Sequence, residues 1–345
     1  MRFERRATRS WGLTLLAPLM AVAVAFVVAG GLIALSGAPV IEAGRRILEN
    51  AFGSRLALTE TLTRTTPLIL TGLAAAVAFR ARVWNIGAEG QFYGGALATA
   101  AMAQVVPGPL AIPALMLAGA VAGVVLLVVP VALRLRFGVD EVVTTLLLNF
   151  IVLLFVSLAI EGFLRDPLAF GWPQSVPVPP EARLPKLVDR SRLHVGLVIA
   201  VLAAVLVYLV NRYTVFGLQA RAAGLSAPAA RFAGVPLSRT LLTTACLSGG
   251  LAGLAGAIEV MGVKGHVSSD LSPGFGYTGI VVAMLAGLSP LGVILAALFV
   301  AALFVGADGM SRALAVPSFI ADVTTSLALL AMLVAIFFTQ YRVAK

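Results

Sequence analysis

Charged residues are scarce in this chain of 345 residues: Asp, Glu, Lys and Arg make up only 12% of it. A water-soluble domain of this length carries about twice that fraction. Apolar residues make up 60%, and runs of about 20 of them recur along the whole sequence. Short segments of alternating hydrophobicity, which mark a transmembrane β-barrel, do not appear. The composition therefore predicts an all-α, polytopic integral membrane protein in a lipid bilayer.

Cysteine and histidine are almost absent. Cys246 is the only cysteine, so a disulfide within the chain is excluded, and its apolar surroundings favour a small core residue. The two histidines, His194 and His266, are far apart in sequence. Because no Cys/His cluster exists, we expect no metal site.

Several motifs are also missing. The sequence contains no G-x-x-x-x-G-K-[ST] phosphate loop, no H-E-x-x-H pair and no G-x-S-x-G in a plausible setting. We therefore expect neither an enzyme nor a bound cofactor, and any ATP would bind a partner subunit. The net charge of +10 raises the possibility of nucleic acid. Since the basic residues lie in loops between apolar runs, membrane orientation explains them better.

Ten apolar stretches are candidate membrane spans within a single transmembrane domain, 1–345. Ser289-Pro290 splits the short eighth and ninth stretches, which predicts a pair of short, broken or re-entrant helices there. The ten stretches cover about 11–35, 61–80, 86–106, 110–133, 142–162, 194–212, 240–261, 277–289, 291–306 and 319–341.

The distribution of basic residues predicts the orientation. With the N-terminus (1–10) inside, the inner segments hold 14 of the 25 Lys and Arg residues and only three acids. The short inner loops carry the clearer signal, because the outer basic residues lie mostly in two longer segments. Both termini are therefore expected on the cytoplasmic side.

The two longer outer segments offer surface to an external partner. Residues 38–56 carry apolar side chains on one face and the i,i+4 pairs Glu42–Arg46 and Arg45–Glu49, which predicts an interfacial helix. Residues 163–193 contain six prolines, a composition that favours an extended, ordered loop. Trp172 would anchor this loop at the interface.

The inner loop 213–239 is the third segment of interest. Ser226 can cap a short helix with Pro228 in its first turn. Arg221 and Arg231 would be available to a partner. Two interpretations stay open from these residues alone: an ordinary cytoplasmic loop, or a coupling helix that docks into an ATPase.

Polar residues interrupt the apolar runs at WNIGAEGQFYGG, residues 84–95. Its glycines lower helix propensity, and a break in a span is tolerated only against protein or a wet cavity. Glu89 has two compatible interpretations: a cap at the start of a helix, or part of the transport path.

A second polar break covers 259–279, after the small-residue run SGGLAGLAGA at 248–257, which suits tight helix packing. Phe275 and Tyr277 are either stacking surfaces for a planar ligand or interface anchors. The candidate pathway residues of the whole chain are Asn85, Glu89, Gln91, Tyr93, Asn149, Glu259, Phe275 and Tyr277.

Four stretches resemble the permease subunits of bacterial ABC importers that serve simple sugars, branched-chain amino acids and nucleosides. The N-I-G-x-E-G-Q stretch is most similar to nucleoside permeases that work with a BMP-type binding lipoprotein. One departure is Leu288 or Ser289, where relatives often carry a charged or amide residue. The four stretches are TPLILTGLAAAVAFRARVWNIGAEGQ (66–91), FGLQARAAGLSAPAARFAGV (216–235), LSGGLAGLAGAIEVMG (247–262) and GFGYTGIVVAMLAGLSPLG (274–292).

The resemblance implies a multi-pass protein of the bacterial inner membrane that imports a small polar solute, namely a nucleoside. It implies a second permease chain, identical or different. It also implies two ABC ATPase subunits on the cytoplasmic side and an extracytoplasmic substrate-binding protein. The alternatives are a simple-sugar permease, or a proton-coupled secondary transporter that would use Glu89, Glu259 and Asp322 as proton sites. The coupling candidates on the inner loop are Arg221, Gly224, Ser226, Pro228 and Arg231.

Overall fold

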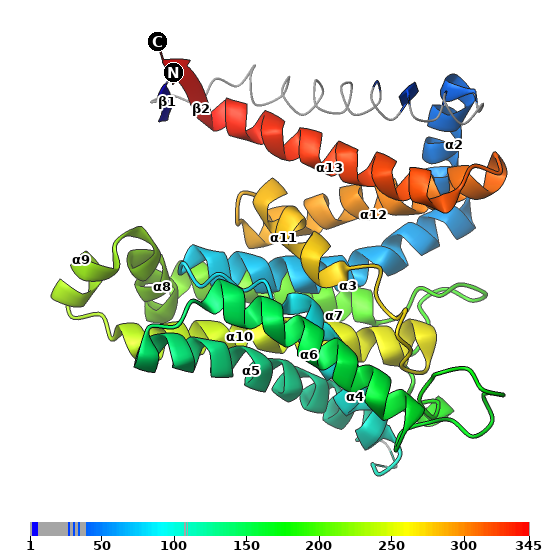
Figure 1. Ribbon diagram of the computed structural model, residues 1–345, viewed down its shortest axis with the longest axis horizontal. Helices are drawn as coiled ribbons and strands as arrows, with labels where there is room; N and C mark the ends of the chain where they lie inside the picture. Colours follow the sequence, from blue (N-terminus) through cyan, green and yellow to red (C-terminus); the bar gives the residue numbers. More distant parts are fainter. Residues whose placement is uncertain are drawn as a thin grey trace. The chain divides into compact units, whose positions relative to one another are not determined.

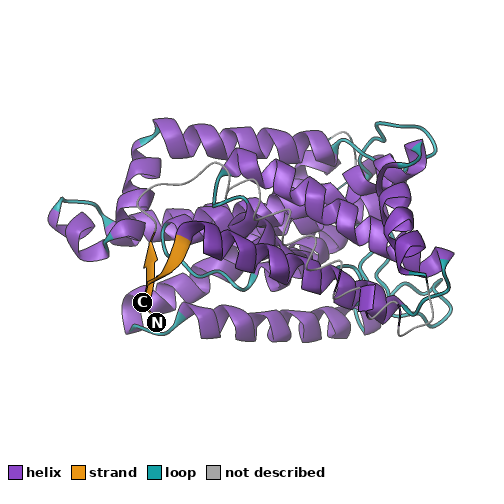
Figure 2. Cartoon of the chain, turned by 90° about the horizontal axis from the view of Figure 1, so that it is seen from above, coloured by secondary structure: helices purple, strands orange, loops and turns teal. Residues whose placement is uncertain are grey.

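The computed structural model describes residues 2–5, 27, 30, 31, 34, 39–106, 108 and 110–344, and these residues are largely helical (Figures 1 and 2). The predicted all-α membrane fold is confirmed, with one addition: two four-residue strands, β1 (Arg2–Arg5) and β2 (Tyr341–Ala344), pair antiparallel. The helices are α2 (Val40–Phe52), α3 (Arg55–Arg80), α4 (Ala88–Ala103), α5 (Ala111–Phe137), α6 (Glu141–Glu161), α7 (Gly196–Tyr213), α8 (Val215–Leu225), α9 (Ala227–Phe232), α10 (Leu237–Glu259), α11 (Phe275–Leu285), α12 (Pro290–Ala313) and α13 (Ser318–Gln340).

Among the described residues, six helices are long and apolar enough to cross a bilayer: α3, α5, α6, α7, α10 with its π-helical extension η2 (Val260–Lys264), and α12. The predicted first span, 11–35, falls mostly outside the described residues. Helix α4 has 16 residues and α11 has 11, so both are shorter than the bilayer core requires. Of the expected pair of short helices around Ser289, the first is confirmed as α11. The second is wrong, because α12 has 24 residues.

The chain divides into two compact units, Met1–Arg64 with Leu298–Lys345, and Thr65–Ala297. In the first unit, the predicted interfacial helix is α2. Both of its expected ion pairs form, Glu42–Arg46 at 2.8 Å and Arg45–Glu49 at 2.7 Å. One side of α2 packs through Ala43, while Ile41, Leu48 and Phe52 are exposed. That exposed apolar stripe suits a helix that lies on a membrane surface.

The core of the second unit is the contact of α4, α5 and α10, which small residues bring close together. A Cβ added at Gly253 of α10 would lie 2.2 Å from the carbonyl oxygen of Gly119 on α5. A Cβ at Gly95 of α4 would lie 2.2 Å from the carbonyl oxygen of Gly253. No real side chain tolerates such distances, so the prediction of tight helix packing at 248–257 is confirmed.

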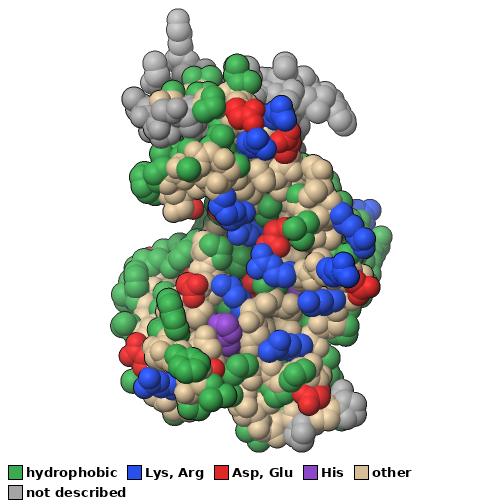
Figure 3. Space-filling view, turned by 90° about the vertical axis from the view of Figure 1, so that its right-hand side faces the viewer, with side chains coloured by type: hydrophobic (Ala, Val, Ile, Leu, Met, Phe, Trp, Pro, Cys, Tyr) green, Lys and Arg blue, Asp and Glu red, His purple; other side chains and the backbone are tan. Residues whose placement is uncertain are grey.

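The second unit presents different structures at its two ends (Figures 1 and 2). One end carries the 163–193 loop, which is non-helical apart from the 3₁₀ turn η1 (Pro180–Ala182). This loop is ordered by bridges to the segment after η2, such as Gln174 with Ser268. Figure 3 shows this end, where charged side chains of both signs lie among apolar ones. The opposite end carries α8 and α9, with α9 at its tip.

Candidate functional site

A pair of buried amides holds the break between α3 and α4. The Asn85 Nδ2 atom donates to Gln91 Oε1 at 2.9 Å, and Gln91 Nε2 donates to Asn85 Oδ1 at 2.9 Å. Asn85 Nδ2 also donates to Ser248 Oγ of α10 at 3.0 Å, and the Ser248 hydroxyl donates to the carbonyl of Ala74 on α3 at 2.7 Å. The amide pair thus ties three helices together around the NIGAEG turn.

Asn149 reaches the same break from α6. Its Oδ1 atom accepts from the backbone N–H of Gly90 at 2.8 Å, and its Nδ2 donates to the carbonyl of Ile86 at 2.9 Å. The same Nδ2 donates to the hydroxyl of Tyr277 on α11 at 3.1 Å. Asn149 is fully buried, so one side chain satisfies a donor and an acceptor that the broken helix leaves open.

Glu89 lies in the first turn of α4 but caps another helix. Its Oε2 accepts from the backbone N–H of Gly276 at 2.6 Å, at the start of α11 and 187 residues away. The Ser272 hydroxyl and the backbone N–H of Tyr277 add hydrogen bonds to the carboxylate. The side chain is only 3% exposed. The positive end of the α11 dipole therefore faces a carboxylate supplied by α4.

Close backbone contact makes this cap possible. A Cβ at Gly276 would lie 2.2 Å from the backbone nitrogen of Glu89, so only glycine admits this approach. One turn further along α4, the Tyr93 hydroxyl donates to the carbonyl of Ser269 at 2.8 Å and accepts from the N–H of Ser272 at 3.1 Å. Helix α4 therefore fixes the loop before α11 as well as the first turn of α11.

The two aromatic candidates have different surroundings. Phe275 is 4% exposed, and its ring lies 5.9 Å from that of Phe92, centroid to centroid. It therefore presents no free face on which a planar ligand could stack. Tyr277 is 40% exposed, although its hydroxyl is bonded to Asn149. Of the eight candidate pathway residues, Tyr277 alone is not buried.

The structure brings seven of the eight candidates together. Asn85, Glu89, Gln91, Tyr93, Asn149, Phe275 and Tyr277 meet where α4, α6 and α11 converge. Glu259 is buried at the end of α10, before η2. Sequence reasoning missed Ser248 and Ser272, because a serine in a small-residue run or a loop gives no signal of its long-range partner.

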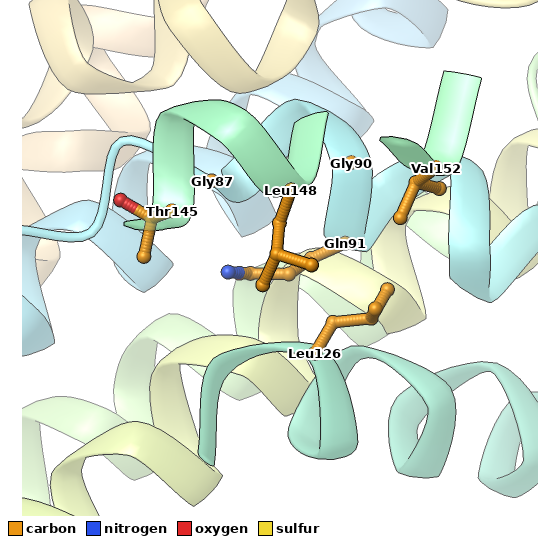
Figure 4. A pocket seen from close by; sticks show the side chains of 7 residues that line it. All are labelled: Gly87, Gly90, Gln91, Leu126, Thr145, Leu148 and Val152. Carbon is orange, nitrogen blue, oxygen red and sulfur yellow. The ribbon is translucent and has the colours of Figure 1, made fainter. Parts of the chain in front are cut away.

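A crevice lies beside the side chain of Gln91 (Figure 4). Its walls are apolar side chains of α5 and α6, with Thr145 at one end. The crevice is too narrow to admit a water molecule. This side of the amide network is therefore packed, and the crevice is not a ready-made substrate cavity.

The inner-loop candidates form two helices, where the sequence predicted one. Ser226 ends α8 and caps α9, with its Oγ 3.4 Å from the backbone N–H of Ala229. A Cβ at Gly224 would lie 2.0 Å from the carbonyl oxygen of Arg80, so glycine permits α8 to touch the end of α3. Arg221 and Arg231 are both exposed. Pro228 stands in the first turn of α9, as expected.

Comparison with known proteins shows that the chain is similar to transport proteins. Residues 57–339 match the family described as branched-chain amino acid transport system / permease component. The chain is 36% identical to a glucose ABC transporter permease protein of Haloferax volcanii, over 98% of this chain and 92% of that protein.

Two relatives are named for nucleosides. A guanosine ABC transporter permease protein of Bacillus subtilis is 34% identical over 92% of each chain. A nucleoside ABC transporter permease protein of Lactococcus lactis is 32% identical over 90% of this chain and 89% of that protein.

Proposed function

The chain belongs to the family of branched-chain amino acid transport system permease components, and on that premise we propose that it is the membrane-spanning subunit of an ATP-driven nucleoside importer. The family-level resemblance of the sequence is thereby confirmed: the chain is a multi-pass membrane permease and not an enzyme. The observation that supports a nucleoside substrate is the similarity of nearly the whole chain to the guanosine and nucleoside permeases.

Simple sugars are the second candidate class. The glucose permease relative covers slightly more of the chain than the nucleoside relatives do. A nucleoside carries a ribose, so both classes present sugar hydroxyls to the protein. What separates them is the base, a planar aromatic ring with polar edges, whose faces need an aromatic or apolar contact.

The proposed transport cycle uses partner subunits at the two ends of the second unit. ATPase subunits would dock against α8 and α9, and a substrate-binding protein would dock against the 163–193 loop on the outer side of the inner membrane. A second permease chain would complete the pathway. We further propose, from the distribution of basic residues in the sequence, that both termini lie in the cytoplasm. ATP would bind and be hydrolysed on the ATPase.

The features of α9 support the coupling assignment. Phe232 is 97% exposed at the end of a six-residue helix, and Arg231 beside it is exposed too. A bare aromatic next to a cation is costly to leave in water but is typical of the centre of a protein interface. Ser226 and Pro228 fix the start of this helix and so the direction in which Phe232 points.

The substrate test uses the assembled complex in proteoliposomes with its binding protein. Uptake of radiolabelled adenosine, uridine, ribose and leucine is measured with ATP and with a non-hydrolysable analogue. ATP-dependent uptake of a nucleoside alone is expected. Uptake of ribose instead would assign the sugar class, and uptake that ignores ATP but collapses with an uncoupler would replace the mechanism by proton coupling.

The coupling test compares Phe232→Ala with Phe170→Ala. Both side chains are almost fully exposed, at 97% and 99%, but Phe170 lies in the loop at the other end. Phe232→Ala is expected to lower ATPase co-purification and ATP-dependent uptake together, while Phe170→Ala leaves co-purification unchanged. Equal co-purification in both variants would contradict the role of α9.

A further inference from the structure

A basic cavity lies at the α8–α9 end of the second unit, away from the polar network. It has a volume of about 390 Å³ and is lined by the last turns of α3 and α7, by α8, and by the link 287–290 before α12. Three arginines from three different helices line it: Arg80 of α3, Arg212 of α7 and Arg221 of α8. None of the described residues that line the cavity is acidic.

The described part of the chain forms no ion pair with the arginines of this cavity, Arg80, Arg212 and Arg221. The Nε atom of Arg80 is buried without a hydrogen-bond partner. Arg80 and Arg221 are close enough to repel each other electrostatically. Arg80 is partly buried, whereas Arg212 and Arg221 are exposed. A partly buried cation beside another of like sign is unfavourable unless an anion joins them.

Helix dipoles explain only part of this arrangement. Arg80 and Arg212 stand in the last turns of α3 and α7, where a cation offsets the negative end of the helix. Arg221 is in the middle of α8, so no helix end accounts for its position. The start of α12 at Ser289-Pro290 adds a positive dipole end to the same cavity. All these contributions favour a bound anion.

We propose that this cavity binds the phosphate headgroup of an anionic membrane lipid through Arg80, Arg212 and Arg221. Guanidinium groups bind phosphate oxygens in bidentate fashion, and basic pockets between membrane helices suit lipid headgroups. The volume exceeds that of a lone phosphate and accommodates a glycerol headgroup. Tyr208 of α7 also lines the cavity and adds an aromatic side chain of the kind found at membrane interfaces.

Apolar surface beside the cavity suits the acyl chains of such a lipid. Leu209 and Val205, about one and two turns along α7 from Arg212 and on the same side of the helix, are 43% and 38% exposed. Leu218 of α8 lines the cavity and is 69% exposed. A lipid therefore matches both parts of the surface, whereas free phosphate or an acidic protein segment matches only the charge. Binding here is independent of which solute the permease carries.

The test measures lipid retention by the purified full-length chain. Native mass spectrometry and a fluorescent-lipid titration compare phosphatidylglycerol with phosphatidylcholine, for the wild type and for Arg80→Gln/Arg221→Gln. The control is Arg165→Gln/Arg190→Gln, which removes the same charge from exposed positions at the opposite end. We expect saturable binding selective for phosphatidylglycerol, weakened roughly 30-fold in the cavity variant and unchanged in the control.

Three further arms keep the outcomes distinct. Arg80→Lys/Arg221→Lys retains the charge and is expected to recover most of the phosphatidylglycerol selectivity; Arg221→Gln alone, at an exposed position, serves if the double variant does not fold. Inorganic phosphate that competes fully with phosphatidylglycerol at millimolar concentration would overturn the lipid assignment. Unchanged phosphatidylglycerol binding in the cavity variant, combined with lost ATPase co-purification, would instead identify a docking site for acidic protein.

Discussion

Removal of the Glu89 carboxylate is predicted to destabilise the second unit by loosening the start of α11. Glu89→Ala leaves the buried N–H of Gly276 without its acceptor at 2.6 Å, along with the other donors that the carboxylate serves. A buried donor left unsatisfied costs about 1–3 kcal/mol, and loss of a helix cap costs about 1 kcal/mol. These effects overlap because they concern the same amides, so we expect a loss of roughly 2–3 kcal/mol.

A conservative variant separates the acceptor from the charge. Glu89→Gln keeps one carbonyl oxygen for Gly276 and loses the charge-assisted part of the bond, so its expected cost is about 1 kcal/mol. Glu161→Gln is the matched control, because Glu161 is an exposed carboxylate at the end of α6. A surface substitution of this kind stays within about 0.5 kcal/mol of the wild type.

The assay is unfolding of the purified chain in mixed micelles as the fraction of dodecyl sulfate rises, with hydrogen exchange across residues 274–280. Faster exchange in the first turn of α11 is expected for Glu89→Ala and not for Glu161→Gln. If Glu89→Ala and Glu161→Gln unfold alike, Glu89 is not a cap. If Glu89→Gln is as unstable as Glu89→Ala, the charge and not the acceptor holds the helix.

Three further predictions concern packing, the amide network and pH. Gly253→Ala is expected to cost about 1–3 kcal/mol by overpacking, whereas Gly250→Ala, whose added Cβ meets only an ordinary contact at 3.4 Å, is tolerated in the same micelle unfolding assay. Asn149→Ala should cost about 2–3 kcal/mol and Tyr277→Phe less than about 1 kcal/mol, because Asn149 serves two backbone groups and Tyr277 only one amide; equal losses would contradict this. Burial lowers the pKa of His194 from its ordinary value of 6.5 to about 4, so the folded state binds fewer protons than the unfolded state and stability falls as the pH drops from 6.5 towards 4. The loss reaches roughly 3 kcal/mol, and unfolding of His194→Asn between pH 7 and 4 should lack this slope.

Local features were predictable from sequence because their partners lie within a few residues. The Ser226 cap, the first-turn Pro228 and the ion pairs of α2 depend only on helical spacing, and all of them form. The small-residue run 248–257 also predicted tight helix packing, since glycines at helical spacing leave room for another backbone. Hydrophobic runs located most of the helices too, because a helix that crosses a bilayer needs a continuous run of apolar residues.

Long-range features were not predictable in this way. The polarity of Glu89 showed that it needs a partner, but nothing nearby in the sequence indicated the amides of α11. Asn149 was a candidate pathway residue, but its three hydrogen bonds depend on how α6 lies against the break, which the sequence does not indicate. The start of α12 at Pro290 agrees with the predicted split, but its length was underestimated because the apolar run ends near 306 while the helix continues through the polar residues Asp308 and Ser311 to Ala313.

The hydrogen bonds of the polar network bear on how transport defects are to be interpreted. In lipid, the open amides and carbonyls of a broken helix need internal partners, and here Asn85, Glu89 and Asn149 supply them. A substitution at any of the three therefore lowers the amount of folded protein even if the solute never touches the residue. Uptake per folded complex, and not uptake per cell, separates support from transport. Tyr277 is the informative contrast, since it is 40% exposed and its loss leaves Asn149 both backbone partners. A fall in uptake per folded complex in Tyr277→Phe, with stability unchanged, would place the solute path along this face of α11.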